Sequence, residues 1–331
     1  MSNVTIKDVA KRANVSIATV SLILNGKAQS IPDSTIERVH AACKELNYKR
    51  NLNASSLKSK ISKLVGLIVP DLENAYYSRV ASSISTDLSE RGYNLVISSC
   101  DNNFQKELVY IEQMANRQVD ALFLFPSATG LLKENRNDLK KALDESGLKI
   151  IILDRKTSFN SYIEVVNDDL YGATLASEYL INKGYKRIAC ITGPKDVSSS
   201  DERLEGYKET LKKHHIYDES LIYTGDYHFP LAKQQAMKIL KRDDVDAIFA
   251  FNDISAYAVY DAADELGKRI GSDIAVVGYD NNQFSDLITP KLTSVGQNIS
   301  EMSSIAVNKM FEDKYEPEII AVQPSLFIRE E

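Results

Sequence analysis

Two patterns of hydrophobic positions divide the chain. Over residues 1–50 the apolar positions recur at helical spacing, whereas from Leu64 onward short continuous apolar runs alternate with amphipathic segments. The first pattern predicts a small all-helical unit. The second predicts an α/β body of parallel sheets with helices on both faces, because each buried strand is followed by a helix that can return over the sheet.

The N-terminal unit is predicted to contain three helices. Thr5 precedes the first as a cap, Ser16 caps the second, and Asn25-Gly26 ends the second. A third amphipathic helix follows within residues 31–48. Two short helices around a tight turn, braced by a third, form a helix-turn-helix, whose second helix lies in the major groove of DNA.

The outward face of the second helix and the local charge both favour DNA binding. Ile17, Ala18, Ser21 and Leu22 share that face and would meet base edges, while Ser16, Thr19 and nearby lysines would meet phosphates. Residues 1–63 carry eleven Lys and Arg against four Asp and Glu, a net charge of +7, whereas the remainder carries −13. A basic head on an acidic body is typical of nucleic-acid binders, although a plain helical subdomain remains the alternative.

The body is predicted to contain two similar sets of strands and helices. The expected strands of the first set lie within residues 64–70, 93–99, 119–126 and 149–154, and those of the second within 162–167, 187–193, 221–226, 246–251 and 273–280. The expected helices cover about residues 76–91, 104–118, 170–183, 203–214, 231–241, 255–267 and 299–311. The similar segments "ERGYNLVIS" and "NKGYKRIACIT" indicate two related halves.

Ligands of open α/β sheets bind at the carboxyl ends of the strands. This rule nominates residues 71–77, 125–127, 154–155, 193–203, 226–229, 252–253 and 280–281. These segments supply carboxylates, amides, arginines and aromatic rings, which together suit a polyhydroxylated ligand.

The segments "TIKDVAKRANVSIATVSLILNG" and "ELNYKRNLNASSLKSK" resemble the DNA-binding head and hinge of the LacI/GalR family of bacterial transcription regulators. The resemblance implies a homodimer on near-palindromic double-stranded operator DNA, with a hinge segment that forms a helix there and inserts a leucine into the minor groove. The DNA-contacting residues would be Thr5, Ser16, Ile17, Ala18, Thr19, Ser21, Leu22 and Asn25 in the head, and Asn53, Ala54 and Leu57 in the hinge.

The resemblance extends to the body, which is similar to periplasmic sugar-binding proteins, and implies two lobes closing around a small sugar. "ENAYY", "ILDR", "DERLEGY", "FAFND", "VGYD" and "VGQN" resemble the ribose-contacting segments of bacterial ribose-binding proteins. The effector-binding residues would be Asn74, Tyr76, Tyr77, Phe125, Asp154, Arg155, Arg203, Phe229, Asn252, Asp280 and Gln297.

By the same analogy the chain would cross between lobes near residues 161–163, 292–294 and 322–324. The expected domains are a helix-turn-helix head over 1–50, a hinge over 51–62 and an effector-binding domain over 63–331. Its first lobe would comprise about 63–161 and 293–322, and its second about 162–292 and 323–331.

Three positions depart from the family pattern. Arg50 stands where proline is common and Ser56 where arginine is common, while Leu22 replaces a frequent arginine or histidine and cannot form a bidentate bond to guanine. Leu22 could instead contact a thymine methyl group. Phe125 stands where ribose binders have an amide, so a related pentose, a hexose or a disaccharide stays open as effector.

The sequence contains no motif that predicts an enzyme, a metal site or a cofactor site. It lacks the nucleotide-binding and nucleophile motifs GxGxxG, GxxxxGK[ST] and GxSxG, and its four histidines form no HExxH pattern. No apolar stretch reaches membrane-span length, and Cys43, Cys100 and Cys190 lie far apart, as free thiols in a cytoplasmic protein would. The expected function is repression of a carbohydrate operon. The alternatives are a regulator of the same family with a nucleobase or phosphorylated effector as corepressor, and a sugar-binding protein that binds no DNA.

Overall fold

The computed structural model describes residues 4–48 and 61–329, and the chain divides into two compact units, with the boundary between Ser62 and Lys63. The predicted hinge contacts Asn53, Ala54 and Leu57 lie outside the described residues. Cys43, Cys100 and Cys190 are all free. Within the two described ranges, no helix combines the length and apolar character needed to cross a bilayer.

The N-terminal unit contains the three predicted helices, α1 (Ile6–Ala13), α2 (Ile17–Leu24) and α3 (Asp33–Glu45). Their inward positions form one small core, consisting of Val9, Ala10, Ala13, Val20, Ile23, Val39 and Ala42. Ser16 caps α2 as predicted, because its hydroxyl accepts a hydrogen bond from the Thr19 amide at 3.0 Å. At the start of α1 the Asp8 carboxylate accepts hydrogen bonds from both the amide and the hydroxyl of Thr5, at 2.8 and 2.7 Å.

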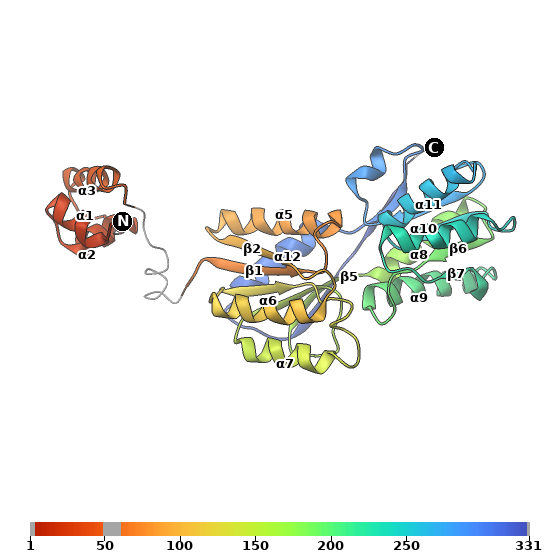
Figure 1. The fold of residues 1–331 in the computed structure, drawn as a ribbon, viewed down its shortest axis with the longest axis horizontal. Coiled ribbons are helices and arrows are strands. Elements are labelled where there is room, and N and C mark those ends of the chain that lie inside the picture. Colours follow the sequence, from red (N-terminus) through yellow and green to blue (C-terminus); the bar gives the residue numbers. More distant parts are fainter. Residues whose placement is uncertain (1–3, 49–60, 330–331) are drawn as a thin grey trace. The chain divides into compact units, whose positions relative to one another are not determined.

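The larger unit has two lobes, each built on a six-stranded sheet (Figure 1). The first sheet is parallel and has the order β11-β5-β4-β3-β1-β2. Its strands are β1 (Leu64–Val69), β2 (Asn94–Ser99), β3 (Ala121–Leu124), β4 (Ile150–Asp154), β5 (Ile163–Asn167) and β11 (Glu318–Val322). Helices α5 (Ala75–Glu90) and α12 (Ile299–Phe311) cover one face, and α6 (Phe104–Asn116) and α7 (Arg136–Ser146) cover the other.

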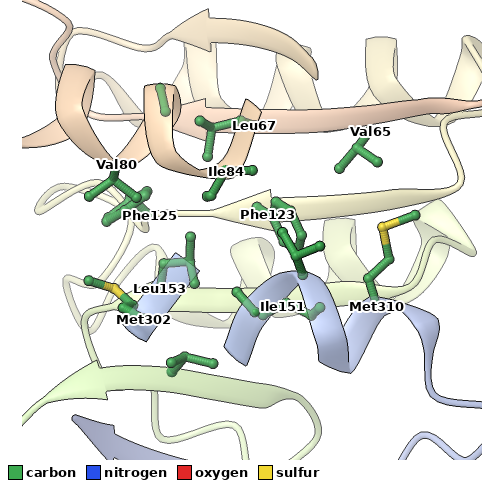
Figure 2. Close-up of a cluster of buried hydrophobic side chains, with 14 of the residues drawn as sticks. Val65, Leu67, Val80, Ile84, Phe123, Phe125, Ile151, Leu153, Met302 and Met310 are labelled. Carbon is green, nitrogen blue, oxygen red and sulfur yellow. The ribbon is translucent and has the colours of Figure 1, made fainter. Parts of the chain in front are cut away.

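Alternate residues of the central strands serve the two faces of this sheet. Leu67, Phe123 and Ile151 point toward α5 and α12, whereas Ile68, Leu122 and Ile152 point toward α6 and α7. Figure 2 shows the first of these cores, with Val80 and Ile84 from α5 and Met302 and Met310 from α12 around the strands. Burial on both faces explains why these strands read as continuous apolar runs.

The second sheet has the order β12-β10-β9-β8-β6-β7, in which only β12 runs antiparallel to its neighbour. Its strands are β6 (Ile188–Ile191), β7 (Ile222–Tyr223), β8 (Ala247–Ala250), β9 (Ala275–Tyr279), β10 (Thr293–Gly296) and β12 (Ser325–Phe327). Helices α8 (Asp169–Asn182) and α9 (Ser198–Lys213) cover one face, and α10 (Phe229–Leu240) and α11 (Asp253–Glu265) cover the other. The two lobes therefore repeat one strand order, as the similar sequence segments indicated.

Two lobe crossings differ from the predicted positions. β5 pairs with β4 and β11 in the first sheet, so the chain leaves the first lobe after Asn167 rather than at residues 161–163. β10 pairs with β9 in the second sheet, so the return follows Gly296 rather than residues 292–294. Apolar runs alone do not indicate which sheet a strand joins, because β5 in the first sheet and β9 in the second are equally buried. The third crossing, between β11 and β12, spans residues 322–325.

Helix α7 was not predicted. Its sequence, RNDLKKALDES, has only three apolar residues, of which Leu139 and Leu143 are buried, so its apolar stripe spans little more than one turn. It ends at Gly147, which adopts a left-handed conformation with φ of 66°.

Candidate functional site

In the N-terminal unit, α2 presents an apolar face to solvent. Ile17 and Leu22 are each 44% exposed, and Ala18 between them is also exposed. The opposite face of the same helix supplies Val20 and Ile23 to the core. An eight-residue helix that leaves large aliphatic side chains in water, within a basic unit, is suited to contact base edges and methyl groups in a groove.

Polar residues border this exposed face. Thr5, Ser16 and Asn25 are exposed, and Thr19 and Ser21 are partly exposed. The Asn25 side-chain amide donates to the Ser21 carbonyl oxygen at 2.6 Å, which ties the end of α2. The structure therefore brings the predicted head residues to α2 and its two ends, apart from Thr5, which precedes α1.

In the larger unit, the carboxyl ends of strands from both lobes line one cleft, which we call the inner chamber. It is lined by Asn74, Tyr76, Tyr77, Asp154, Arg155, Ser199, Arg203, Tyr227, Asn252, Asp280 and Gln297. Nine of the eleven predicted effector-binding residues are in this set. Asp154, Arg155, Arg203, Asn252, Asp280 and Gln297 are all buried, so water has little access to their polar groups.

A chain of hydrogen bonds connects the two lobes at the base of the inner chamber. The Tyr76 hydroxyl donates to Asp154 Oδ1 at 2.8 Å. Asn167 Nδ2 donates to Gln297 Oε1, and Gln297 Nε2 donates to Asp280 Oδ1 at 2.6 Å. The Asn167 amide also lies 3.4 Å from the Tyr76 hydroxyl, so one carboxylate from each lobe is joined through side chains near the lobe crossings.

Each lobe contributes one buried arginine to the inner chamber. Arg155 donates through Nη2 to the Tyr77 hydroxyl at 2.9 Å and through Nη1 to the Pro126 carbonyl at 2.6 Å. Its buried Nε has no hydrogen-bond partner among the described residues. Arg203 donates through Nε to Asp169 Oδ1 at 2.8 Å and stacks 3.6 Å from the centroid of the Tyr279 ring. Both guanidinium groups are therefore held in place by the protein before any ligand binds.

Burial alters the acidity of the carboxyl groups here. Burial raises the pKa of Asp280 well above its ordinary value, and Arg203 only partly offsets this. Burial likewise raises the pKa of Asp169 to about 7, against the opposing charge of Arg203. Keeping such groups in a dry cleft costs free energy that a ligand with hydroxyl donors can offset.

Asn74 and Asn252 also have structural roles. Asn74 caps α5 by accepting from the Tyr76 amide at 3.0 Å, and Asn252 caps α11 by accepting from the Ser255 amide at 2.9 Å. Each cap uses the side-chain oxygen. The Asn252 amide nitrogen donates to the Tyr227 carbonyl at 3.0 Å, which fixes the loop that carries Tyr227.

Two predicted effector residues do not line the cleft. Phe125 is fully buried behind it, in edge-to-face contact with Tyr76 and Tyr77. Phe229 is 37% exposed at the start of α10, and Tyr227, two residues earlier, lines the cleft instead. The Tyr227 ring lies against Gly193, where a Cβ would come within 2.1 Å of the ring.

Sequence analysis missed Asn167, Ser199 and Tyr227 as individual site residues. Asn167 ends β5, so the strand-end rule could have found it had that strand been placed in the first lobe. Ser199 and Tyr227 lie inside the nominated segments 193–203 and 226–229, but nothing in the sequence separates them from their neighbours.

Comparisons with known proteins agree with this architecture. Residues 5–51 match the model of bacterial regulatory proteins of the lacI family, and residues 177–330 match a periplasmic binding protein-like domain. The ribose operon repressor of Halalkalibacterium halodurans is 33% identical over 91% of this chain and 88% of its own length. Among solved structures, the lac repressor dimer bound to operator and the anti-inducer ONPF has a TM-score of 0.86 and 26% identity, covering 99% of this chain and 98% of its own.

A complex of the transcriptional regulator CelR with cellobiose is 29% identical, with a TM-score of 0.71 and coverage of 99% of both chains. These three proteins are transcriptional regulators rather than enzymes, in agreement with the sequence analysis. With a helical head, a two-lobed body and matches along nearly its whole length, the chain belongs to the LacI family of bacterial regulatory proteins.

Proposed function

We propose that this repressor binds operator DNA through α2 and that a sugar held between its lobes controls its affinity for the operator. The observation that carries the proposal is the inner chamber, where carboxylates, amides and arginines from both lobes converge in a buried cleft. Two buried atoms, Nε of Arg155 in the chamber lining and Oδ1 of Asn167, which is bonded to Gln297, have no hydrogen-bond partner among the described residues. Such groups are costly unless a ligand completes their bonding.

The relatives support a sugar as the ligand. One is a repressor of a ribose operon, and a solved neighbour is a complex with cellobiose. Hydroxyl pairs suit the carboxylates Asp154 and Asp280, and the rings of Tyr76, Tyr77 and Tyr227 can cover the apolar face of a sugar.

The DNA-binding part of the proposal has two elements. Exposed Ile17, Ala18 and Leu22 would contact base edges, and Ser16, Thr19 and the basic side chains of the head would contact phosphates. The hinge residues Asn53, Ala54 and Leu57 would add minor-groove contacts. Since the lac repressor in its operator complex is a dimer, we propose that this protein also binds as a homodimer, with one head on each half-site, in the bacterial cytoplasm.

Coupling between sugar and DNA would pass through the lobes. A sugar that binds one arrangement of the lobes more tightly shifts the population toward it, and by linkage the sugar and operator change each other's affinity by the same factor. Release of DNA by the sugar is the expected direction for a repressor of a sugar operon.

The test uses the full chain and a duplex selected from a random library. Anisotropy measurements at several salt concentrations should give an affinity that falls steeply with salt, because bound phosphates release counterions. Adding a panel of mono- and disaccharides should weaken operator binding by about 5- to 150-fold for at least one sugar. Failure to select any duplex would contradict the DNA-binding part, and a selected duplex that no sugar affects would contradict the sugar part.

A further inference from the structure

The second lobe contains a pocket at the opposite end of its sheet from the cleft, which we call the basal pocket. β9 and β10 begin in this pocket, at Ala275 and Thr293. The residues that follow the other ends of these strands, Asp280 and Gln297, line the inner chamber. No described residue lines both sites, and the basal pocket has a volume of about 280 Å³. It is therefore a cavity separate from the cleft between the lobes.

The basal pocket lies where neighbouring strands of the sheet begin at different levels. Ala275 and Val276 pair with β8, but the first residue of β9 that pairs with β10 is Val277, opposite Thr293. Side chains from α8, from α11 and from the segment that leads into β10 surround the gap beside the start of β9. The walls of the pocket thus belong largely to the regular elements of the lobe.

We infer that the basal pocket is a second small-molecule site, which binds a single-ring organic anion with its ring on the apolar floor and its carboxylate or phosphate toward two lysines. The floor is formed by four buried residues, Leu180, Ala275, Val276 and Val277. Since a cavity of about 150 Å³ accepts benzene, a volume of about 280 Å³ has room for one ring with a charged substituent. The inference does not depend on the proposed function.

The charges of the basal pocket favour an anion. Lys183, Lys291 and Arg329 line it, and no Asp or Glu of the described chain does, although the protein after residue 63 has a net charge of −13. Arg329 is held by Asp286, whose carboxylate accepts from Nε at 2.7 Å. Lys183 and Lys291 are exposed, and neither forms an ion pair within the part of the chain that the structure describes. These two ammonium groups are the donors available to an anionic ligand.

The aromatic lining favours a flat ring over a sugar. Tyr179, Tyr185 and Tyr260 line the pocket, and Lys183 Nζ lies 5.6 Å from the centroid of the Tyr179 ring. Tyrosine rings pack well against another aromatic ring, and here a cation is adjacent for its charged substituent. Lysine and arginine side chains donate hydrogen bonds but accept none, so a sugar would find no charged acceptor for its hydroxyls. The basal pocket and the cleft therefore suit different chemical classes.

Ligand-observed NMR on the full chain, without DNA or sugar, tests the inference with matched probes. These are benzoate and phenyl phosphate, the uncharged ring benzamide, and the ringless anions acetate and inorganic phosphate. At least one aromatic anion should bind about tenfold more tightly than benzamide, because an exposed ion pair with each lysine adds about two- to fivefold. It should also bind more tightly than its ringless counterpart. Equal binding of benzamide or of the ringless anion, or no binding of any probe, would overturn the inference.

Three lysine variants test which charges hold the anion. Lys183→Gln and Lys291→Gln should each weaken binding of the aromatic anion about two- to fivefold. Lys186→Gln is the matched control, because Lys186 is exposed and lies three residues from Lys183 but does not line the pocket. Its affinity should equal that of the wild type. Equal affinities of all three variants would overturn the assignment of the two lysines to this site.

A fluorescent reporter tests the location independently. The sequence contains no tryptophan, so the emission of a single introduced one reports on its own surroundings. Ile328→Trp, at the exposed rim of the pocket, should change its emission on titration with the aromatic anion. Ile319→Trp, at a similarly exposed position on β11 in the first lobe, should not. An anion that binds without changing the emission of Ile328→Trp, as one in the cleft would, overturns the site while leaving the proposed function intact.

Discussion

Asp154 and Asp280 occupy equivalent places in the two lobes: each directly ends or follows the fourth strand of its repeat, and each has a positive φ, 69° and 107° respectively. Few residues other than glycine adopt this conformation, because the side chain then crowds the backbone. Both carboxyl groups are also buried. Strain and burial at the same two positions show that neither residue is optimised for stability, which is typical of binding sites.

Replacing Asp280 should separate stability from ligand binding. Asp280→Asn keeps the shape and tolerates positive φ, but removes a buried charge that burial disfavours. We expect sugar affinity to fall about 10- to 100-fold and the melting temperature without sugar to stay equal or rise. Calorimetry and thermal melting measure the two effects. Unchanged sugar affinity would mean that Asp280 does not contact the ligand.

Arg79 provides a contact between the lobes outside the cleft. It lies on α5 in the first lobe and donates to the carbonyls of Asp280 and Asn281 in the second, at 3.2 and 2.8 Å. Arg79→Met keeps most of the side-chain volume but removes these bonds, so the closed arrangement of the lobes should lose stability. We expect sugar affinity to fall about tenfold.

Arg91→Met is the matched control for Arg79→Met. Arg91 follows the end of the same helix and donates to Asn308 within the first lobe. Its replacement should change sugar affinity by less than about twofold, as for other surface substitutions. Small-angle X-ray scattering should show a larger radius for Arg79→Met than for Arg91→Met without sugar. Equal radii and equal sugar affinities of the two variants would mean that Arg79 does not stabilise the closed arrangement of the lobes.

The sequence predicted most of the fold because its physical causes are local. Continuous apolar runs such as "KIIILD" became buried strands, and the polar residues at their ends, such as Asp154 and Arg155, reached the cleft. The lobe to which each strand belongs was harder to predict, because the pairing of β5 with β11 joins segments far apart in the chain. The sequence could not predict that Tyr227 rather than Phe229 lines the cleft. The position of Tyr227 depends on the close approach of its ring to Gly193 and on its positive φ.

Asp253 should make the stability of the protein depend on pH. Its buried carboxylate accepts from the Asn282 amide at 2.6 Å, the Ser294 hydroxyl at 2.6 Å and the Ser285 hydroxyl at 3.0 Å. Burial nevertheless raises its pKa from 3.8 to about 6. Between about pH 4 and 6 the folded state therefore binds more protons at this site than the unfolded state, so this contribution to stability is lost as the pH rises.

Asp253→Asn lacks this titration and serves as the reference. The free energy of unfolding of the wild type, minus that of the variant, should fall by about 2 kcal/mol between pH 4 and pH 7, with most of the change below pH 6. Urea unfolding followed by circular dichroism at each pH measures the difference. A difference that grows with pH would mean that the three donors outweigh burial and hold the pKa low.

The proposed contact between α2 and DNA can be tested by replacing two alanines of the head. Ala18 and Ala41 are both exposed helical positions, on α2 and α3 respectively. Ala18→Asp and Ala41→Asp add the same charge to the same unit, so they change its overall attraction to DNA equally. Asp at position 18 also lies in the first turn of α2, where the helix dipole favours it, so folding should not suffer.

Ala18→Asp should weaken operator binding about 100-fold, because it places a carboxylate against the bases and phosphates, whereas Ala41→Asp should weaken it only a few-fold. Anisotropy with the selected duplex measures both affinities, and circular dichroism checks that both variants keep their helices. The affinity of both variants for sugar should match that of the wild type, since both changes lie in the head. If the two substitutions weaken DNA binding equally, α2 is not the reading helix and the head binds DNA through its net charge alone.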